Sequence, residues 1–415
     1  MRTASEHLAA ILGSLEPAPA ERVALTDALG LVVAEEVEAL VDLPGFDNSS
    51  MDGYAVRSVS LERAREGGEV ALTLVGEVAA GDDPTFTVGE GQAARIMTGA
   101  RLPDGADAVI AIEDTDGSAA GEVRCRATAP AGQFIRRRGE DVRSGTVVVH
   151  RGETVGPRTI ALLAASGHAD VLAHARPHVV VLSTGAELVA PGEPLGPGQI
   201  HDSNSSMIWA AAVAAGATAE MRSTVGDTEK QLLAALDEAL AGADVVVTSG
   251  GVSMGAYDVV KAALRDEGID FVKVAMQPGK PQGFGFLVGP GGRRVPLFAL
   301  PGNPVSSYVS FEVFVRPALR RLMALTPESR PIRTARLTTP MSSPGGRRQY
   351  ARAVVSRGAT GLEASPVTGQ GSHFVADLSR ANALLVVPED ATRLAEGDEV
   401  DVMLLEGEEC LDGTG

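Results

Sequence analysis

Cysteine is scarce in this chain of 415 residues, which contains only Cys125 and Cys410. Two cysteines cannot build a disulfide framework, and the absence of CxxC and HExxH patterns excludes a structural zinc site. Long apolar runs are missing too: no stretch reaches about 18 apolar residues, and the N-terminal sequence MRTASEHLAAIL lacks the apolar segment of a signal peptide. The sequence therefore predicts a cytoplasmic protein that does not span a membrane.

Basic residues are outnumbered, with 36 Lys and Arg against 54 Asp and Glu, so the net charge is −18. This charge disfavours nucleic acid and anionic membranes as partners, although a local basic pocket can still bind an anion. The chain has no GxxxxGK[ST] motif and no GxGxxG motif after the first strand of its α/β region, and neither Ser253 nor Ser306 stands in a GxSxG elbow. A P-loop ATPase, a classical dinucleotide-binding enzyme and a serine hydrolase are therefore disfavoured.

The composition that remains is that of a globular protein, with 44% hydrophobic and 22% charged residues. At the N-terminus, Thr3 and Glu6 form a capping-box pattern, and the apolar residues that follow recur at helical spacing. A second short helix is expected over about residues 26–36. Short apolar runs between residues 70 and 149 predict strands. Helix resumes at Pro157, so the β segment is inserted between two helical segments, which we expect to pack together.

Strands and helices alternate from Pro177 to Leu322, which predicts a doubly wound α/β domain. Short strands separated by turn residues follow after Pro327 and predict a small β domain. The length itself is consistent with roughly three domains of about 150 residues. The expected boundaries are a helical domain over residues 1–42 and 146–176, an inserted mostly-β domain over 43–145, the α/β domain over 177–326 and a C-terminal β domain over 327–415.

Polar residues follow the strands of the α/β region, at the edge where such domains bind ligands. Glycines and hydroxyls in these loops suit a phosphate or another oxyanion. Glu187, Asp227 and Asp258 stand at the same edge and would repel an anion unless a cation such as Mg²⁺ bridges them. The pattern favours metal-assisted phosphate chemistry. Each loop taken alone is more often a simple tight turn, and only their number at one edge favours a site.

Two lysines could supply positive charge. Lys280 lies in a Pro-Gly turn and Lys273 lies upstream on a strand, although a solvated lysine is the commoner interpretation. The polar stretch 47–54 is typical of an Asx-type turn. The basic run that starts at Arg136 and ends in two acids is compatible with a solvated loop or with an anion-contacting edge, and composition does not decide between them.

Six motifs stand out in order along the chain: DNSSMDGYAVR (47–57), IMTGARLP (96–103), RGEDV (138–142), STGAEL (183–188), TSGGVSMGAYD (248–258) and PGNPVSS (301–307). Together they resemble the MoeA family, whose members are molybdopterin molybdenumtransferases related to the C-terminal part of gephyrin. The resemblance spans nearly the whole chain, and motifs of this length in this order are very specific. It implies a MogA-like doubly wound α/β domain combined with a helical domain, an inserted β domain and a small C-terminal β domain.

The resemblance also implies a reaction and partners. Molybdate would enter adenylylated molybdopterin with the help of Mg²⁺, and AMP would leave. The substrate dithiolate would supply the sulfur ligands, so the protein needs few cysteines. A homodimer with a shared site is implied, together with an upstream MogA-like adenylyltransferase and downstream proteins of molybdoenzyme maturation.

The functional residues that the resemblance implies fall into three groups. The polar residues expected to be catalytic are Asp52, Thr98, Asp141, Glu187, Asp227 and Asp258, of which Glu187, Asp227 and Asp258 would hold the metal. The residues expected to bind molybdopterin or molybdate are Ser183, Thr184, Gly185, Thr248, Ser249, Gly250, Gly251, Ser253, Lys273, Lys280, Pro301, Gly302, Asn303, Pro304 and Ser306. The residues expected to close the site from the C-terminal domain are Arg347, Arg352 and the stretch 379–383, and Arg352 is counted among the binding residues.

The chain departs from the family at Gln277, where many members have a second lysine. The molybdate pocket would lose one positive charge, and the binding of the molybdate anion could shift to Arg352 or Lys280. Two other functions stay open. A MogA-like enzyme that adenylylates molybdopterin or hydrolyses a nucleotide would consume ATP. A dimeric scaffold without chemistry, as in gephyrin's anchoring role, would have no need of four acidic residues together, namely Asp52, Glu187, Asp227 and Asp258.

Overall fold

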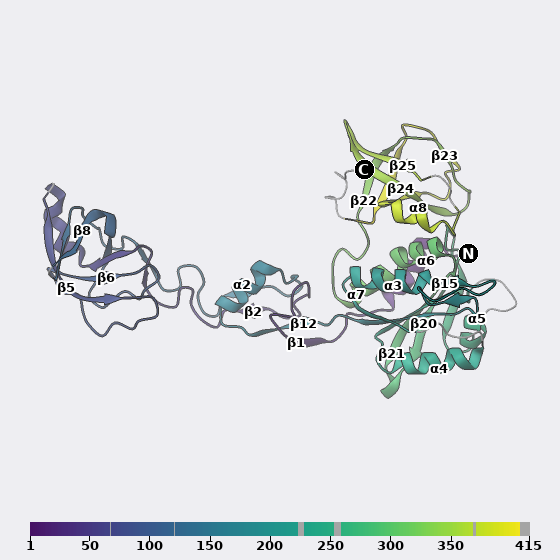
Figure 1. The fold of residues 1–415 in the computed structure, drawn as a ribbon, viewed down its shortest axis with the longest axis horizontal. Helices are drawn as coiled ribbons and strands as arrows, with labels where there is room; N and C mark the ends of the chain where they lie inside the picture. Colours follow the sequence, from purple (N-terminus) through teal and green to yellow (C-terminus); the bar gives the residue numbers. More distant parts are fainter. Residues whose placement is uncertain (67, 120, 223–227, 253–258, 368–370, 407–415) are drawn as a thin grey trace. The chain divides into compact units, whose positions relative to one another are not determined.

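The computed structural model describes residues 1–66, 68–119, 121–222, 228–252, 259–367 and 371–406 (Figure 1). The chain divides into two compact units, which are described separately below. The first contains residues 1–21, 30–32 and 173–415, and the second contains residues 22–29 and 33–172. Among the described residues, no helix combines the length and the apolar character that crossing a membrane requires.

A six-stranded sheet forms the centre of the first unit. Its strand order is β16-β13-β17-β21-β20-β18, and β16, β13, β17 and β21 run parallel while β20 is antiparallel to both of its neighbours. The strands are β13 (His178–Ser183), β16 (Thr218–Met221), β17 (Val245–Ser249), β18 (Ile269–Lys273), β20 (Pro281–Val288) and β21 (Arg294–Leu300). This doubly wound arrangement confirms the α/β domain that the alternation predicts.

Helices cover both faces of this sheet because successive side chains of a buried strand point to opposite sides. Val179 and Val181 of β13 pack toward α3 (Ser203–Ala214), α6 (Pro304–Ser310) and α7 (Arg316–Leu322). Val180 and Leu182 pack on the other face, toward α4 (Glu229–Leu240) and α5 (Val259–Leu264) (Figure 1). The side chain of Thr228 caps α4, accepting from the Gln231 N–H. One π-helical turn, η4 (Phe311–Val315), joins α6 to α7.

The N-terminal helix belongs to the first unit. α1 (Ala4–Gly13) begins with the predicted capping box between Thr3 and Glu6. Its buried side chains, such as Ile11, join the core that contains α7 and η4. The residues expected to form a helical domain are thus divided between the units, with α1 in the first and α2 (Pro157–Ala165) in the second.

A second six-stranded sheet forms the C-terminal part of the first unit, and an additional pairing between β24 and β26 gives it a barrel-like closure. Its strands are β19 (Met276–Gln277), β22 (Ile332–Leu337), β24 (Arg348–Gly358), β25 (Gly361–Pro366), β26 (Ala383–Val387) and β28 (Glu399–Leu404). Small and branched side chains such as Ala351, Ala353 and Leu385 fill its interior. One short helix, α8 (Val375–Arg380), was not expected from the sequence.

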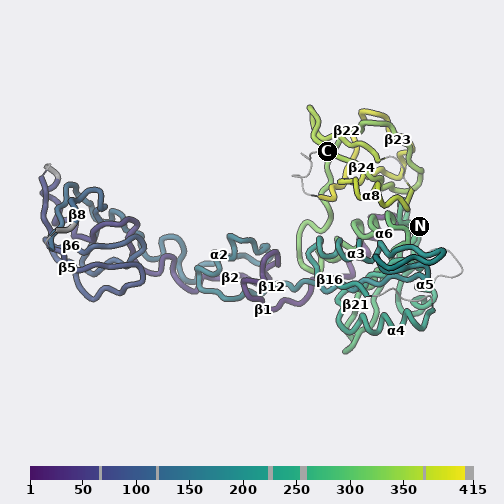
Figure 2. Tube along the Cα trace, viewed as in Figure 1, coloured from purple at the N-terminus to yellow at the C-terminus, as the bar shows by residue number. Residues whose placement is uncertain are grey.

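The second unit contains the inserted sheet, in the order β7-β4-β6-β5-β9-β8. Its strands are β4 (Gly53–Val56), β5 (Val70–Val78), β6 (Gln92–Ile96), β7 (Ala108–Ala111), β8 (Thr115–Ala119) and β9 (Glu122–Cys125). Chain segments far apart in sequence run side by side where β2 (Val37–Glu38) pairs with β11 (Val147–Val149), as the colours of Figure 2 show.

The helix expected over residues 26–36 is wrong, because this segment consists of turns and short bridges. Val33 exchanges backbone hydrogen bonds with residues 152 and 153, and Ala34 donates to the carbonyl of Leu172. These distant partners satisfy the backbone in an extended form, which suits a β-branched residue such as valine. A local pattern alone does not reveal such partners.

Candidate functional site

A pocket of about 840 Å³ lies at the carboxyl ends of β13, β17 and β21. Parallel pairing aligns the strand ends, with Ser183 opposite Ser249 and Ser249 opposite Leu300. The loops that follow the three strands therefore meet at one edge. The lining residues that the sequence had predicted are Thr184, Glu187, Ser249, Gly250, Gly251, Pro301, Gly302, Asn303, Pro304 and Ser306.

Backbone hydrogen bonds hold the three loops together. The Thr184 N–H donates to the Ser249 carbonyl at 3.2 Å, and the Gly250 N–H donates to the Leu300 carbonyl at 3.1 Å. Gly250 has a φ of +94°, and a Cβ there would stand 2.9 Å from the Thr184 carbonyl oxygen. Only glycine fits this close approach without strain, so Gly250 lets the loops after β13 and β17 come together at the pocket.

The carboxylate of Glu187 folds back against its own loop. A Cβ on Gly185 would lie 2.7 Å from Glu187 Oε2 and 2.9 Å from its Oε1. Gly185 does not line the pocket itself but leaves room for this carboxylate. The sequence placed Gly185 among the ligand-binding residues, and the structure gives it this indirect role.

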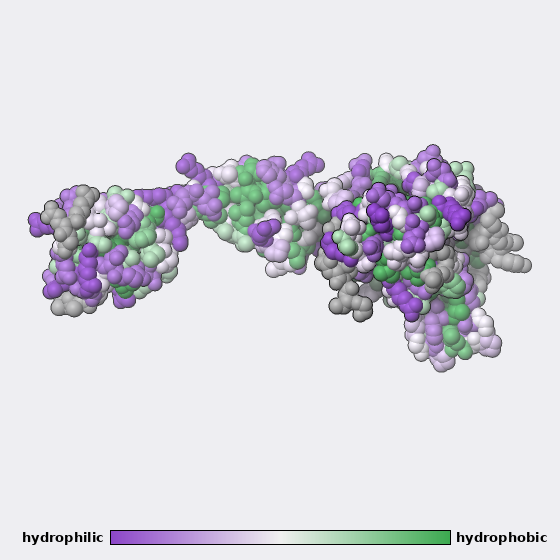
Figure 3. All heavy atoms as spheres, turned by 90° about the horizontal axis from the view of Figure 1, so that it is seen from above, coloured by the Kyte–Doolittle hydropathy of each residue, from purple (hydrophilic) through white to green (hydrophobic). Residues whose placement is uncertain are grey.

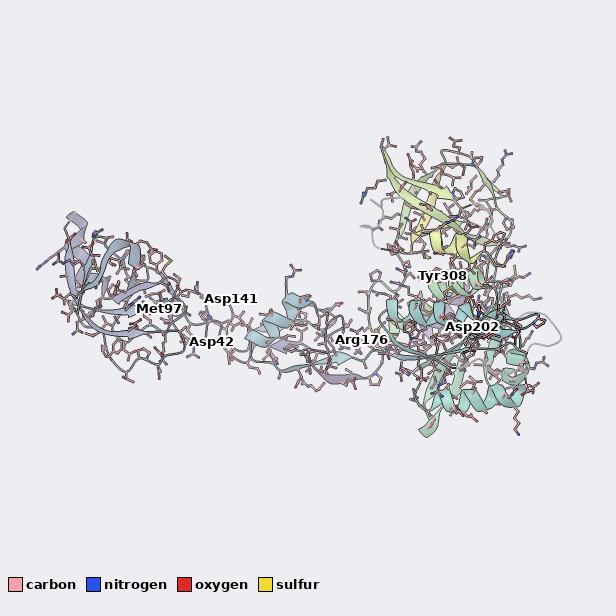
Figure 4. All side chains as sticks on the ribbon, in the orientation of Figure 1. Asp42, Met97, Asp141, Arg176, Asp202 and Tyr308 are labelled. Carbon is pink, nitrogen blue, oxygen red and sulfur yellow. The ribbon has the colours of Figure 1, made fainter. Side chains whose placement is uncertain are left out.

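The first turn of α3 is a part of the pocket that sequence reasoning missed. Asp202, labelled in Figure 4, is buried and caps the helix: its Oδ1 accepts from the Ser205 N–H at 3.0 Å and from the Ser183 hydroxyl at 3.2 Å. Ser183 is fully buried, and its hydroxyl holds the Asp202 carboxylate at the start of α3. Aspartate is a favoured N-cap residue, and Asp202 places the start of α3 at Ser203, inside the pocket lining.

Asn204 links two of the strand-end loops. Its Nδ2 donates to Ser249 Oγ at 2.8 Å and to the Gly302 carbonyl at 2.7 Å. Its Oδ1 is buried and has no hydrogen-bond partner in the described protein. An acceptor of this kind is available to a ligand or a cation in the pocket.

The C-terminal domain contributes residues 371–375, which we call the strap. His373 and Val375 of the strap line the pocket. Ser372 joins the strap to the start of α6, because its carbonyl accepts from the Val305 N–H and its hydroxyl accepts from Asn303 Nδ2 at 2.9 Å. Neither His373 nor Val375 belongs to the motifs that carried the sequence-based prediction.

Other predicted binding residues stand away from the pocket lining. Thr248 is fully buried within β17, and Arg352 is 1% exposed behind the strap. Lys273 and Lys280 are exposed, on either side of the β18–β20 turn, and do not line the pocket. Ser253, Asp227 and Asp258 lie outside the described residues.

Gln277 has a clear structural partner. Its Oε1 accepts a hydrogen bond from Arg347 Nη1 at 3.2 Å, across the parallel pairing of β19 with β24. A positive charge of the C-terminal domain thus contacts the Gln277 side chain. Gln277 therefore serves as an acceptor for arginine.

The remaining predicted catalytic residues lie in the second unit. Asp52 Oδ1 accepts from the Thr98 N–H at 2.6 Å and from the Thr98 hydroxyl at 2.8 Å. These two hydrogen bonds, the backbone one foremost, hold the pKa of Asp52 below its usual value. Asp141 is exposed and donates its N–H to the Leu43 carbonyl at 3.0 Å. Figure 4 labels it near Asp42, whose carboxylate binds Arg138.

Few of the described residues could serve as metal ligands. Within the part of the chain that the structure covers, no group of three or more His, Cys, Asp or Glu is placed to hold a metal ion. Glu187 is the described member of the predicted set, and its carboxylate and the buried Asn204 Oδ1 are oxygen donors of the kind that Mg²⁺ prefers. The chemistry of these donors fits magnesium.

A doubly wound domain with a polar pocket at its strand ends, in a chain that also has a barrel-like C-terminal sheet and an inserted β sheet, defines the class as a multidomain protein with a ligand pocket on its α/β domain. Residues 180–321 match the family model described as "Probable molybdopterin binding domain". Residues 2–167 match the MoeA N-terminal region (domain I and II), and residues 334–405 match the MoeA C-terminal region (domain IV). The chain belongs to the MoeA family.

Known proteins resemble the chain over almost its whole length. It is 44% identical over 412 residues to molybdopterin molybdenumtransferase 2 of Mycobacterium tuberculosis, covering 97% of this chain and 99% of that protein. It is 36% identical over 394 residues to the molybdopterin molybdenumtransferase of Bacillus subtilis, covering 94% of this chain and 90% of that protein. A crystal structure of the molybdopterin biosynthesis MoeA protein from Pyrococcus horikoshii, 34% identical, superimposes with a TM-score of 0.80 and covers 98% of this chain and 99% of that one.

Proposed function

We infer that this chain is a transferase of molybdenum cofactor biosynthesis, a molybdopterin molybdenumtransferase. The pocket carries this conclusion. Three strand-end loops and the first turn of α3 bring hydroxyls, backbone amides and the Glu187 carboxylate to one edge of a molybdopterin-binding type of domain. Donors and carboxylates gathered in this way suit a phosphate-bearing substrate and a cation that screens its charge.

The finer reaction is our proposal. Adenylylated molybdopterin binds with its phosphates over the loops after β13 and β17. Two Mo–S bonds to the dithiolate replace two Mo–O bonds of molybdate, whose oxygens take up protons and leave as water. One equivalent of water cleaves the phosphoanhydride, and AMP leaves. Mg²⁺, when bound, screens the phosphate charge. Glu187 would hold it, with Asn204 Oδ1 as a further oxygen donor. Asp227 and Asp258 are the other proposed ligands.

The protein need not supply a sulfur ligand or a covalent nucleophile in this reaction. Cys125 is a free thiol buried in the sheet of the second unit, and burial raises its pKa to about 11. A thiol in that state is unreactive, because the thiolate is the nucleophile and the metal ligand. This supports the proposal that the substrate dithiolate binds the molybdenum. A free thiol also fits a reducing compartment, and we propose the cytoplasm.

We also propose that the chain acts as a homodimer. Figure 3 shows hydrophobic residues gathered on the part of the second unit that carries α2 and β2. Leu40 and Val41, which stand beside Gly167, are 60% and 46% exposed. Exposed apolar surface of this kind favours association with a second copy. Light scattering coupled to size exclusion should give twice the monomer mass, and a monomer at micromolar concentration would reject the dimer.

The decisive test of the function is the release of AMP from adenylylated molybdopterin by the purified full chain. We expect release that requires both molybdate and Mg²⁺, with active cofactor recovered by an apo-molybdoenzyme. Consumption of ATP without a need for molybdate would support an adenylyltransferase or a nucleotide hydrolase instead. Tight binding of the intermediate without AMP release would support a scaffold. The same assay would show whether the substrate must come from a separate adenylyl-transfer enzyme.

Gly185→Ala should weaken the response to Mg²⁺ without unfolding the protein. The added Cβ would displace the Glu187 carboxylate, which lies 2.7 Å from that position. We expect the Mg²⁺ concentration for half-maximal AMP release to rise by about 10-fold, the usual scale for disturbing the support of a metal ligand. Gly242→Ala is the matched control, since nothing lies within 4 Å of a Cβ there. An unchanged Mg²⁺ dependence in the Gly185→Ala variant would contradict the role given to this loop.

A further inference from the structure

The pocket holds little positive charge for a substrate that carries phosphate. Among the described residues that line it, the side chains able to become cations are His201 and His373, and none is lysine or arginine. Glu187 and Asp202 add negative charge at the same surface. A bound phosphate therefore depends on backbone amides, hydroxyls, any cation held by Glu187, and these two imidazoles.

The two histidines differ in what they already bind. His201 Nε2 donates to the Glu193 carbonyl at 3.0 Å within its own loop, so one of its nitrogens is occupied. The imidazole of His373 forms no hydrogen bond with any described residue, and this ring packs on Phe374 at a centroid distance of 4.3 Å and an angle of 55°. The contact with Phe374 restrains the imidazole of His373. The two imidazole nitrogens remain available to the pocket that His373 lines.

The strap that carries His373 is held from two sides. Ser372 bonds to Asn303 and Val305 at the start of α6, as described above. Behind the strap, Arg352 Nη1 donates to the Phe374 carbonyl at 2.9 Å, and its Nη2 donates to the Gly371 carbonyl at 3.2 Å. The backbone on both sides of His373 is thus anchored to a buried guanidinium on β24. A rigidly supported side chain loses little entropy when it meets a ligand.

We propose that His373 is a substrate-contacting residue that donates a hydrogen bond to the phosphate of the bound pterin, and that Arg352 is a positioning residue that holds the strap. The proposal deepens the function proposed above and rests on it for the identity of the substrate. It assigns a binding role to a side chain of the C-terminal domain outside the motifs. It also explains why a buried arginine supports the pocket without lining it.

Two variants of His373 test the contact in the full chain. The readouts are the Kd of adenylylated molybdopterin, measured without molybdate and Mg²⁺, and the KM and kcat of AMP release. We expect His373→Ala to raise Kd and KM by about 10-fold or more, as for a hydrogen bond to a charged group, with kcat changed by less than about threefold. His373→Gln keeps a donor and should recover part of the loss. His178→Gln is the control, since His178 starts β13 at the opposite end from the pocket and should leave both constants unchanged.

Arg352→Gln should raise Kd as His373→Ala does, and the double variant should be no worse than the poorer single one. Such non-additivity is expected if Arg352 acts through His373. Because Arg352 is buried, its variant must first match the wild-type circular dichroism, and Ser372→Ala provides a second, milder disturbance of the strap.

The outcomes separate this inference from the proposed function. A Kd in His373→Ala within twofold of wild type would overturn the inference even if AMP release is intact. Binding that weakens as expected, in a protein that releases no AMP, would support the contact and reject the transferase. A wild-type chain that binds no adenylylated molybdopterin would overturn both.

Discussion

Glu187→Gln should reduce the rate of molybdate-dependent AMP release by about 100-fold or more. Glu187 is the described carboxylate that lines the pocket without serving as a helix cap, whereas Asp202 is engaged by Ser183 and Ser205. Removing the negative charge of Glu187 lowers the affinity for Mg²⁺, and the phosphate charges of the substrate are then screened less. A metal ion is worth several kcal/mol of charge stabilisation, and each 1.36 kcal/mol corresponds to about tenfold in rate.

Initial rates of AMP release across a Mg²⁺ titration would measure the effect. Raising Mg²⁺ should restore part of the activity, because glutamine keeps one oxygen donor. Glu193→Gln is the matched control: Glu193 lies in the same loop region, and its side chain does not line the pocket. A Glu187→Gln variant that retains more than a third of the wild-type rate would show that the carboxylate does not serve the reaction.

Glu312→Gln should lower the free energy of unfolding of the first unit by about 3–5 kcal/mol, the cost of breaking a buried ion pair by removing one partner. Glu312 lies in the π-helical turn η4 with its side chain 2% exposed. Arg330 donates to both of its oxygens, Nε to Oε2 at 2.8 Å and Nη2 to Oε1 at 3.1 Å. Arg316 stands 3.9 Å away. Without the carboxylate, two largely buried guanidinium groups would face each other uncompensated.

The pKa values of Arg316 and Tyr308, which lie beside Glu312, also show the influence of its charge. Burial lowers the pKa of Arg316 to about 10, with the charge of Arg330 adding to this and Glu312 opposing it. Burial also raises the pKa of Tyr308, and the negative charge of Glu312 raises it further. The Glu312 carboxylate is therefore the negative charge that compensates Arg316 and Arg330. Without it, two largely buried positive charges would be left unpaired, which is costly.

Urea unfolding followed by tryptophan fluorescence would measure the loss. Trp209 is the single tryptophan of the chain and lies on α3 in the same unit, so its signal reports on the right part of the protein. Asp270→Asn is the control, because the Asp270–Arg2 pair has side chains 56% and 46% exposed and should contribute no more than about 1 kcal/mol. Equal unfolding midpoints for Glu312→Gln and Asp270→Asn would refute the prediction.

Much of the fold could be predicted because local patterns are satisfied locally. The capping box of Thr3 and Glu6 and the cap of Thr228 use partners three residues away. The run of valines in β13 predicts a strand buried on both faces, and the sheet has it between two layers of helices. The same reasoning failed over residues 26–36, where partners far along the chain decide the backbone conformation.

The site divides in the same way. The loops after β13, β17 and β21 could be predicted, because parallel strands place their carboxyl ends at one edge of a sheet. The contributions of Asn204 and the strap could not. Arg352 was expected as a binding residue, and the structure places it behind the strap, where it donates to the strap backbone. Asn204 reaches Gly302 across 98 residues of sequence, and Arg352 reaches Phe374 across 22.

The sequence by itself determined the family, the order of strands and helices, and the edge of the sheet where the pocket forms. Tertiary structure alone decided which side chains complete that pocket and which ion pair is buried elsewhere in the same unit. The reason is physical: periodicity and capping are set by neighbours within one or two turns. The hydrogen bonds of Asn204 and Arg352 and the pairing of Glu312 with Arg330 depend on how separate elements pack.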